Sequence, residues 1–140
     1  MRHVLARILK FIAVAVLLVG VCLYVLGNYS EITLELTCTG YWKELGQNKE
    51  VAEVAHVQLT EYRWWVLGES DGNVKVQTEK LASAHYIPFV EKIGKGSLAI
   101  YEFRESKSGD FKGGYRAANG EITLKFSDNL FFVGTSCRPR

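Results

Sequence analysis

The stretch that decides the fold is residues 32–39, ITLELTCT, in which apolar and polar side chains alternate. A period of two predicts a β-strand with one face in a core and the other, rich in threonine, in water. Similar runs return at short spacing to the end of the chain, and Asn119-Gly120 between two of them is typical of a tight hairpin turn. We therefore predict an all-β domain, a small antiparallel meander that forms a barrel or a curved sandwich of about eight or nine strands.

A hydrophobic segment precedes this domain. The run FIAVAVLLVGVCLYVLG, Phe11–Gly27, contains no charged residue, and as a helix it would be about 25 Å long, close to the thickness of a bilayer core. We expect a cytoplasmic basic tail over residues 1–10, a transmembrane signal-anchor helix over 11–27, a linker over 28–30 and an exported domain over 31–140. A secretory signal that is cleaved before Asn28 is the alternative.

The distribution of charge predicts the orientation of the chain. Arg2, Arg7 and Lys10 precede the apolar run, whereas all 15 acidic residues follow it. Positive charge stays on the cytoplasmic side, so we expect a single pass through the cytoplasmic (inner) membrane with the domain in the periplasm or outside the cell. The domain itself is close to neutral and has no basic stripe, and we therefore expect no nucleic-acid partner.

Two cysteines lie at opposite ends of the predicted domain. Cys38 is on the first strand and Cys137 on the last, and each falls on the face expected to be buried. First and last strands are neighbours in a closed meander, so the two thiols can meet and oxidise in an exported protein. Two separately buried thiols are the alternative. Neither His56 nor His85 has a partner at metal-ligand spacing, so we expect no metal and no cofactor.

The centre of the chain combines further strands with a segment that fits two assignments. We expect separate strands at residues 51–59, with Val51, Ala55, Val57 and Leu59 inside, and at 61–67, with Tyr62, Trp64 and Val66 inside. Residues 79–96 fit a helical turn at Leu81, Ala84 and His85, followed by a short helix framed by Pro88 and Gly94. A strand through residues 84–87 is an equal alternative.

One motif resembles a known family. Gly40-Tyr41-Trp42 follows the first strand, and Arg138 and Arg140 follow the last. This resembles the calycin barrels, the lipocalins and avidin-like proteins, in which a Gly-x-Trp near the start of the barrel packs against a basic residue from the last strand. The resemblance implies that Gly40, Trp42 and Arg138 close one end of a barrel, with a cation-π contact on Trp42, and that the other end admits a small apolar ligand.

A second resemblance concerns architecture. Small periplasmic lysozyme inhibitors of bacteria are compact antiparallel barrels tied by cysteines near both ends, and GGYRAANGEITLKF, residues 113–126, is similar to their central motif. The tryptophan expected in that motif is missing from this chain. The resemblance implies a protein-binding module of the cell envelope.

Two kinds of site follow from the strand assignment. One is a cavity inside the barrel for a small apolar ligand, lined by Tyr62, Trp64, Tyr101, Phe103 and Tyr115. The other is an exposed apolar face for a partner, formed by Trp65, Leu67 and Phe132, because several strands, including the one from Leu98, carry apolar residues on both faces. Covering of this face by residues 79–96 is an alternative.

Catalysis is not indicated by the sequence. No G-x-S-x-G nucleophile motif occurs and no glycine-rich phosphate loop precedes a helix. We expect a binding protein and not an enzyme. The first hypothesis is a membrane-anchored extracytoplasmic domain that binds a small apolar ligand within its barrel, and the alternative is a protein-interaction or inhibitor module of the envelope that acts through its outer face.

Overall fold

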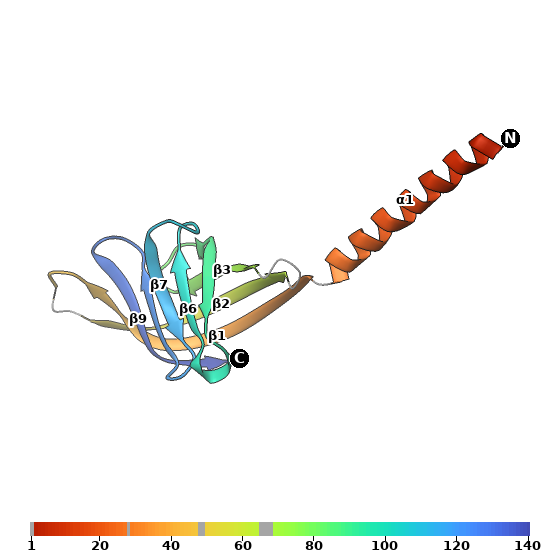
Figure 1. Cartoon of the computed structure of the whole chain (residues 1–140). Helices are drawn as coiled ribbons and strands as arrows, with labels where there is room; N and C mark the ends of the chain where they lie inside the picture. Colours follow the sequence, from red (N-terminus) through yellow and green to blue (C-terminus); the bar gives the residue numbers. More distant parts are fainter. Residues whose placement is uncertain (1, 28, 48–49, 65–68) are drawn as a thin grey trace.

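The computed structural model describes residues 2–27, 29–47, 50–64 and 69–140. A single apolar helix is followed by a strongly curved antiparallel sheet (Figure 1). The elements are α1 (Arg2–Gly27), β1 (Tyr29–Glu44), β2 (Val51–Trp64), β3 (Glu69–Thr78), β4 (His85–Ile87), β5 (Phe89–Ile93), the 3₁₀ turn η1 (Gly96–Leu98), β6 (Ile100–Arg104), β7 (Phe111–Arg116), β8 (Glu121–Lys125) and β9 (Leu130–Pro139). The predicted fold class, an N-terminal helix followed by an antiparallel barrel-like sheet, is confirmed.

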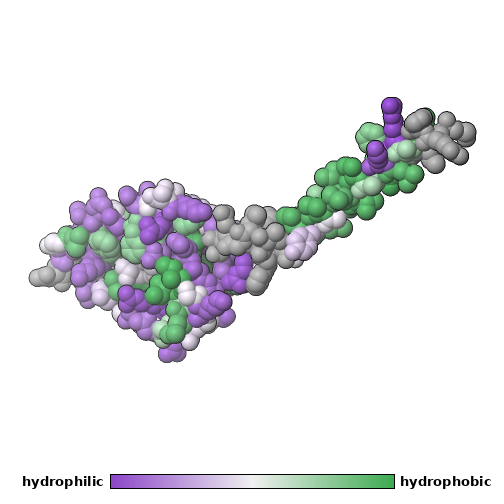
Figure 2. Space-filling model, in the orientation of Figure 1, coloured by the Kyte–Doolittle hydropathy of each residue, from purple (hydrophilic) through white to green (hydrophobic). Residues whose placement is uncertain are grey.

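The helix is longer than the apolar run from which it was predicted. α1 covers Arg2–Gly27, and its segment Ala6–Gly27 is long and apolar enough to cross a membrane. No side chain of that segment is buried, and Figure 2 shows it as a hydrophobic rod beside a largely hydrophilic domain. A membrane anchor and a signal sequence both have these properties.

The described strands form one nine-stranded sheet in the order β4-β3-β2-β1-β9-β8-β7-β6-β5. Its two edge strands, β4 and β5, are consecutive in the chain and are separated by Pro88 alone. The chain therefore passes directly from one edge of the sheet to the other, and the sheet is nearly closed. A barrel arranged in this way hides most of its strand edges.

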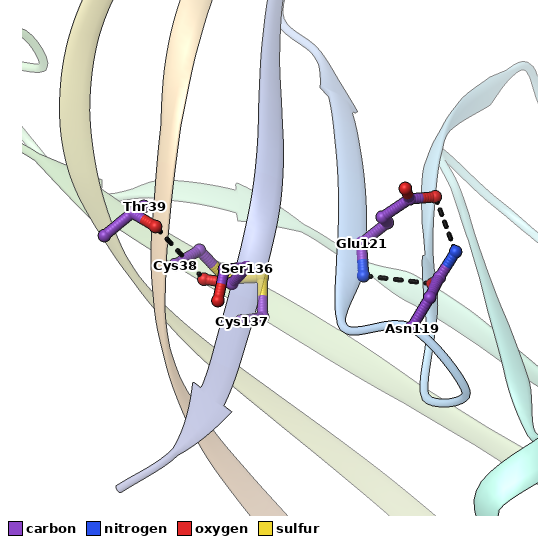
Figure 3. Close-up of a disulfide and its surroundings, with 6 residues drawn as sticks. All are labelled: Cys38, Thr39, Asn119, Glu121, Ser136 and Cys137. Atoms are coloured by element: carbon purple, nitrogen blue, oxygen red, sulfur yellow. Dashed lines mark hydrogen bonds between the residues drawn. A yellow bond between two sulfur atoms is a disulfide. The ribbon is translucent and has the colours of Figure 1, made fainter.

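The first and last long strands are neighbours, as a closed meander requires. Cys38 lies opposite Cys137 in the register of β1 and β9, and their sulfurs form a disulfide. The backbone N–H of Cys137 also donates to the oxygen of Gly120, 2.7 Å away, in the β7–β8 turn. Figure 3 shows that turn, with Asn119 and Glu121, next to the disulfide. The predicted bridge thus joins β1 and β9 beside a third element.

The centre of the chain contains strands in place of the predicted helices. The alternative of a strand through residues 84–87 is confirmed as β4, and the helix framed by Pro88 and Gly94 is wrong, because β5 occupies those residues. Val90 is buried and Lys92 also turns inward, which is a period of two. Gly94 has a φ of +83° and lies in the turn that joins β5 to β6.

The predicted second and third strands are one strand. β2 runs without a break through Val51–Trp64, and Ala55, Val57 and Leu59 are buried as expected, whereas Val51 is exposed. Continued alternation places Glu61 and Arg63 on the inner face and Tyr62 on the outer face. The prediction that Tyr62 points into the core and Glu61 to solvent is therefore wrong.

Candidate functional site

The predicted ligand cavity is occupied by core side chains. Phe103 is fully buried, and Tyr101 and Tyr115 are nearly so, with ring centroids 5.9 Å apart. All three belong to the continuous hydrophobic core. Tyr62 is half-buried on the outer face, where its hydroxyl accepts a hydrogen bond from the amide of Asn73. The side chain of Trp64 lies outside the described part of the structure. The cavities that the structure describes are lined by other residues.

A charged cluster lies next to these tyrosines on the inner face. The carboxylate of Glu61, a residue only 4% exposed, lies 2.6 Å from the guanidinium of Arg63 and 3.1 Å from the ammonium of Lys92 on β5. The ammonium is also 5.4 Å from the ring centroid of Tyr101. Burial opposes the charge on Lys92, but its interactions with Glu61 and Tyr101 outweigh burial and raise its pKa. The cluster is thus a network of fixed charges in the barrel wall.

Sequence reasoning missed this cluster. The alternation Ala55, Val57, Leu59 points directly to position 61 as the next inward residue, and that signal was available in the sequence. The aromatic character of Tyr62 and Trp64 favours the opposite assignment, with these two residues inside and Glu61 outside. A carboxylate is rarely buried without a partner. The same alternation places Arg63 beside Glu61, whereas Lys92 on β5 becomes apparent only from the fold.

Trp42 packs in the core, but the cation over its ring is not the arginine that the calycin resemblance implies. Its ring is 4.9 Å from that of Phe126 and 5.6 Å from that of Phe132, and its indole N–H donates to the carboxylate of Glu53. The ammonium over its face, 4.9 Å from the ring centroid, is that of Lys80. The prediction that Arg138 covers Trp42 is wrong, because Arg138 pairs with Thr37, five residues earlier on β1.

Gly40 has a local reason to be glycine. A Cβ atom at this position would lie 2.2 Å from the carbonyl oxygen of Val133. The register of β1 and β9 shifts here, since Thr39 lies opposite Ser136 but Gly40 lies opposite Gly134, which leaves Thr135 as an extra residue in β9. This β-bulge brings the two backbones close together at Gly40.

The bulge also corrects the predicted apolar face. Phe132 was expected on the outside, but it is completely buried and packs on Trp42. One extra residue reverses the inside-outside alternation along β9, so Phe132 and Cys137 both face inward although one has an even and the other an odd number. Trp65 and Leu67, the other two residues predicted for this face, lie outside the described residues.

A different apolar surface is exposed on the β5–β6 hairpin. Ile93 lies directly opposite Ile100, and Leu98 precedes Ile100 by two residues. These side chains are 46%, 40% and 75% exposed, respectively. We call Ile93, Leu98 and Ile100 the hairpin patch. The outward position of Leu98 and Ile100 agrees with the prediction that this segment is apolar on both faces, and Ile93 was missed because β5 was expected to be helical.

The rim of the hairpin patch is charged. Arg116, exposed on β7, lies opposite Ile100, and Lys95 is exposed in the turn. In the next row of the same face Glu91 lies opposite Glu102, whose carboxylate is 2.9 Å from the guanidinium of Arg104. An apolar centre with charges of both signs around it has the composition of a protein-binding surface.

A polar groove of about 160 Å³ lies on the outer face of β1, β2 and β3. Its lining includes Glu35, His56, Lys75 and Arg140. Among the residues that the structure describes, no three metal-ligating side chains lie close enough to share an ion.

Burial, and then the charge of Lys112, lower the pKa of His85, and its ring packs against Phe126 with centroids 4.7 Å apart.

Comparisons with known proteins add no relative. Searches of protein-family models, of curated proteins and of solved structures found no match to this chain. The resemblance to calycin barrels therefore stays a prediction, and the arguments about function rest on the geometry of this chain.

Proposed function

We propose that this chain is a membrane-anchored, extracytoplasmic protein-interaction module that binds a partner protein through the hairpin patch. The observation that carries the proposal is the exposure of Ile93 and Ile100, which lie opposite each other, and of Leu98 in the adjoining turn, on a domain whose interior is a packed core. Exposed apolar side chains grouped together are typical of binding surfaces, whereas isolated ones are common everywhere.

Three features support the proposed compartment. The apolar helix precedes a domain with a disulfide, and such bridges persist in oxidising compartments outside the cytoplasm. With the basic residues before the helix, this favours a single pass through the cytoplasmic membrane with the domain in the periplasm or outside the cell. Retention of the helix as an anchor, as opposed to its cleavage as a signal, is part of the proposal.

Binding of a small apolar ligand inside the barrel has less support. Three of the five residues expected to line its cavity are buried against one another in the core. No arrangement of described side chains suggests a reaction centre to us, and we propose binding and not catalysis.

Photo-crosslinking in the native membrane tests the proposal. A photoreactive amino acid replaces Leu98 in the full-length chain, and the matched control carries it at Thr123, an exposed position on the outer face of β8. We expect a discrete cross-linked protein from position 98 and none from position 123. The cross-link from position 98 should disappear when Ile93→Ser and Ile100→Ser are added. Cross-links from position 98 to lipid alone, or to a second copy alone, would contradict a partner protein.

The same preparation tests the anchor. The mass of the membrane-extracted protein should include residues 1–27. A mass that lacks them would replace the anchored form with a secreted one and would leave the hairpin patch to be tested on the free domain.

A further inference from the structure

A cavity of about 460 Å³ lies at one end of the barrel, and its volume is in the range typical of small-molecule sites. Its lining comes from β4, from Pro88, from the β6–β7 turn and from β7 and β8. β6 and β8 end where β7 and β9 begin, so these segments meet at one end of the sheet. In Figure 1 it is the end of the barrel opposite the C-terminus.

Part of the lining of this cavity is apolar. Ile87, Pro88 and Phe126 contribute to it, and the ring of Phe126 lies 4.9 Å from that of Trp42 in the core. Because that core is packed, a ligand would lie at the end of the barrel and not inside it. The apolar part suits a short hydrocarbon or aromatic group.

The same cavity is lined by basic side chains. Gly113 lies opposite Leu124 in β7 and β8, so the next residues, Lys112 and Lys125, lie at the same end of two neighbouring strands. Both line the cavity together with His85. Burial, and then the charge of Lys112, lower the pKa of His85, which places this imidazole within electrostatic reach of the ammonium. Two ammonium groups and an imidazole therefore share one cavity.

The acidic partners of the two lysines are more exposed than the lysines themselves. The ammonium of Lys112 is 2.7 Å from the carboxylate of Glu105, and that of Lys125 is 2.8 Å from the carboxylate of Asp128. The lysine side chains are 23% and 32% exposed, whereas those of Glu105 and Asp128 are 59% and 94% exposed. Exposed ion pairs contribute little to stability. An anion that also buries an apolar group can therefore replace these carboxylates at small cost.

We propose that this cavity binds a small organic anion, a carboxylate attached to a short apolar body. The carboxylate lies between the ammonium groups of Lys112 and Lys125, and the apolar body contacts Phe126 and Ile87. Charge-assisted hydrogen bonds fix the orientation of the ligand, and the apolar contacts add affinity. The hairpin patch lies at the other end of β5, so neither proposal depends on the other.

A titration followed by nuclear magnetic resonance tests the site. The probe is 4-phenylbutyrate, and its matched control is the neutral 4-phenylbutyramide. The full-length protein in mild non-ionic detergent carries ¹³C-labelled histidine, and the ring signal of His85, assigned with His85→Gln, is followed against the free ligand concentration. We expect a saturable shift with a dissociation constant of about 1 mM or lower for the carboxylate and at least about tenfold weaker binding of the amide.

Variants of the lysines test the role of the cations. Lys112→Met and Lys125→Met should each weaken binding of 4-phenylbutyrate by at least about fivefold, because each removes one ammonium and keeps the apolar chain. The control is Lys95→Met, at the other end of β5, which should change binding by less than about twofold. Equal binding by all three variants would overturn the proposal.

Variants of the acidic residues test the same site in the opposite direction. Glu105→Gln and Asp128→Asn remove carboxylates that compete with the ligand for the two ammonium groups. Each should strengthen binding of 4-phenylbutyrate by about twofold to fivefold. Both positions are exposed, so these variants keep the test decisive even where a lysine variant fails to fold. Weaker binding by both would contradict displacement of the carboxylates.

The pH dependence of binding provides a further readout. The charged groups around His85 are Lys112, Lys125 and Glu105 in the cavity and Asp110 and Asp128 beside it. Carboxylates and ammonium groups titrate outside the range from about pH 6 to about pH 8, whereas imidazole titrates within it. A bound carboxylate favours protonated His85 and raises its pKa, so binding should tighten as the pH falls through this range. His85→Gln should abolish this dependence.

Two results would refute the site. One is the absence of a saturable shift of the His85 signal with 4-phenylbutyrate, and the other is equally strong binding of the neutral amide.

Discussion

The ammonium of Lys92 lies 3.1 Å from the carboxylate of Glu61, and this ion pair joins β5 to β2 on the inner face of the barrel. β5 lies at one edge of the sheet and β2 lies near the other. The pair therefore links two parts of the sheet that no backbone ladder connects directly. Arg63, 2.6 Å from the same carboxylate, provides a second cation.

Removal of Glu61 should be strongly destabilising. Glu61→Ala leaves Lys92 and Arg63 without their common carboxylate in a largely buried place, and we expect a loss of about 3 to 5 kcal/mol in the free energy of unfolding. The matched control is Glu102→Ala, which breaks a half-exposed pair with Arg104 and should cost about 1 kcal/mol or less. Urea unfolding of both variants measures the difference, and equal losses would contradict the role assigned to Glu61.

A double variant tests whether the cost comes from uncompensated charge. Glu61→Leu with Lys92→Met replaces one buried ion pair by apolar side chains of similar size. We expect it to be more stable than Glu61→Leu alone, because one cation no longer lacks its partner. No recovery in the double variant would mean that the loss comes from packing.

The disulfide should contribute much of the stability of the domain. Cys38 and Cys137 are 99 residues apart, and closing a loop of this size stabilises the folded state by about 4 to 5 kcal/mol on the chain-entropy model. Cys38→Ala with Cys137→Ala should lower the free energy of unfolding by that order. The control is Cys22→Ala, at the free, exposed cysteine of the helix, which should leave unfolding of the domain unchanged.

His85 should make stability sensitive to mild acid. Burial and the charge of Lys112 lower the pKa of its imidazole, so the folded state favours the neutral form. The contribution of neutral His85 to the free energy of unfolding is fully present above the unfolded pKa of about 6.5. It is lost as the pH falls below that value, because the unfolded chain then takes up a proton more readily than the folded one. Between about pH 8 and about pH 5, the thermal midpoint should fall further in the unsubstituted protein than in His85→Gln. Equal falls would show that other groups control the effect.

The stability of the domain should be sensitive to deletion of Thr135, the extra residue of the bulge, but not to its substitution. Thr135 is exposed, so Thr135→Ala should change the free energy of unfolding by no more than about 0.5 kcal/mol. Deletion of the residue removes the register shift and turns residues such as Phe132 to the opposite face. We expect a loss above about 3 kcal/mol, the usual cost of removing one large buried aromatic side chain. A stable deletion variant would contradict the role of the bulge.

The sequence predicts the fold where alternation is regular. Residues 32–39 and the cysteine pair are assigned correctly, because each depends on a local period of two or on the neighbourhood of first and last strands. Prediction fails for residues 89–93, where proline and glycine suggested helix ends, and pairing with β6 decided the structure instead. Local preferences are weak compared with tertiary pairing.

The candidate sites are harder to predict, for a geometric reason. The inner or outer position of Phe132 depends on one extra residue in β9. Gly134, a glycine inside the strand, is a signal for a bulge, but it does not say which residue is extra. Gly40, on the neighbouring strand, is the residue that accommodates it.

Only residue 28 lies between Gly27, the last helical residue, and Tyr29, where β1 begins. The Cα atoms of Gly27 and Tyr29 are therefore at most about 7.6 Å apart. In the proposed anchored form, the domain and any partner in the same bilayer search for each other within a thin layer, at an effective concentration that can reach the millimolar range. A weak intrinsic affinity suffices for stable association in the membrane. A binding measurement on the excised domain in dilute solution would therefore underestimate the extent of association of the anchored protein.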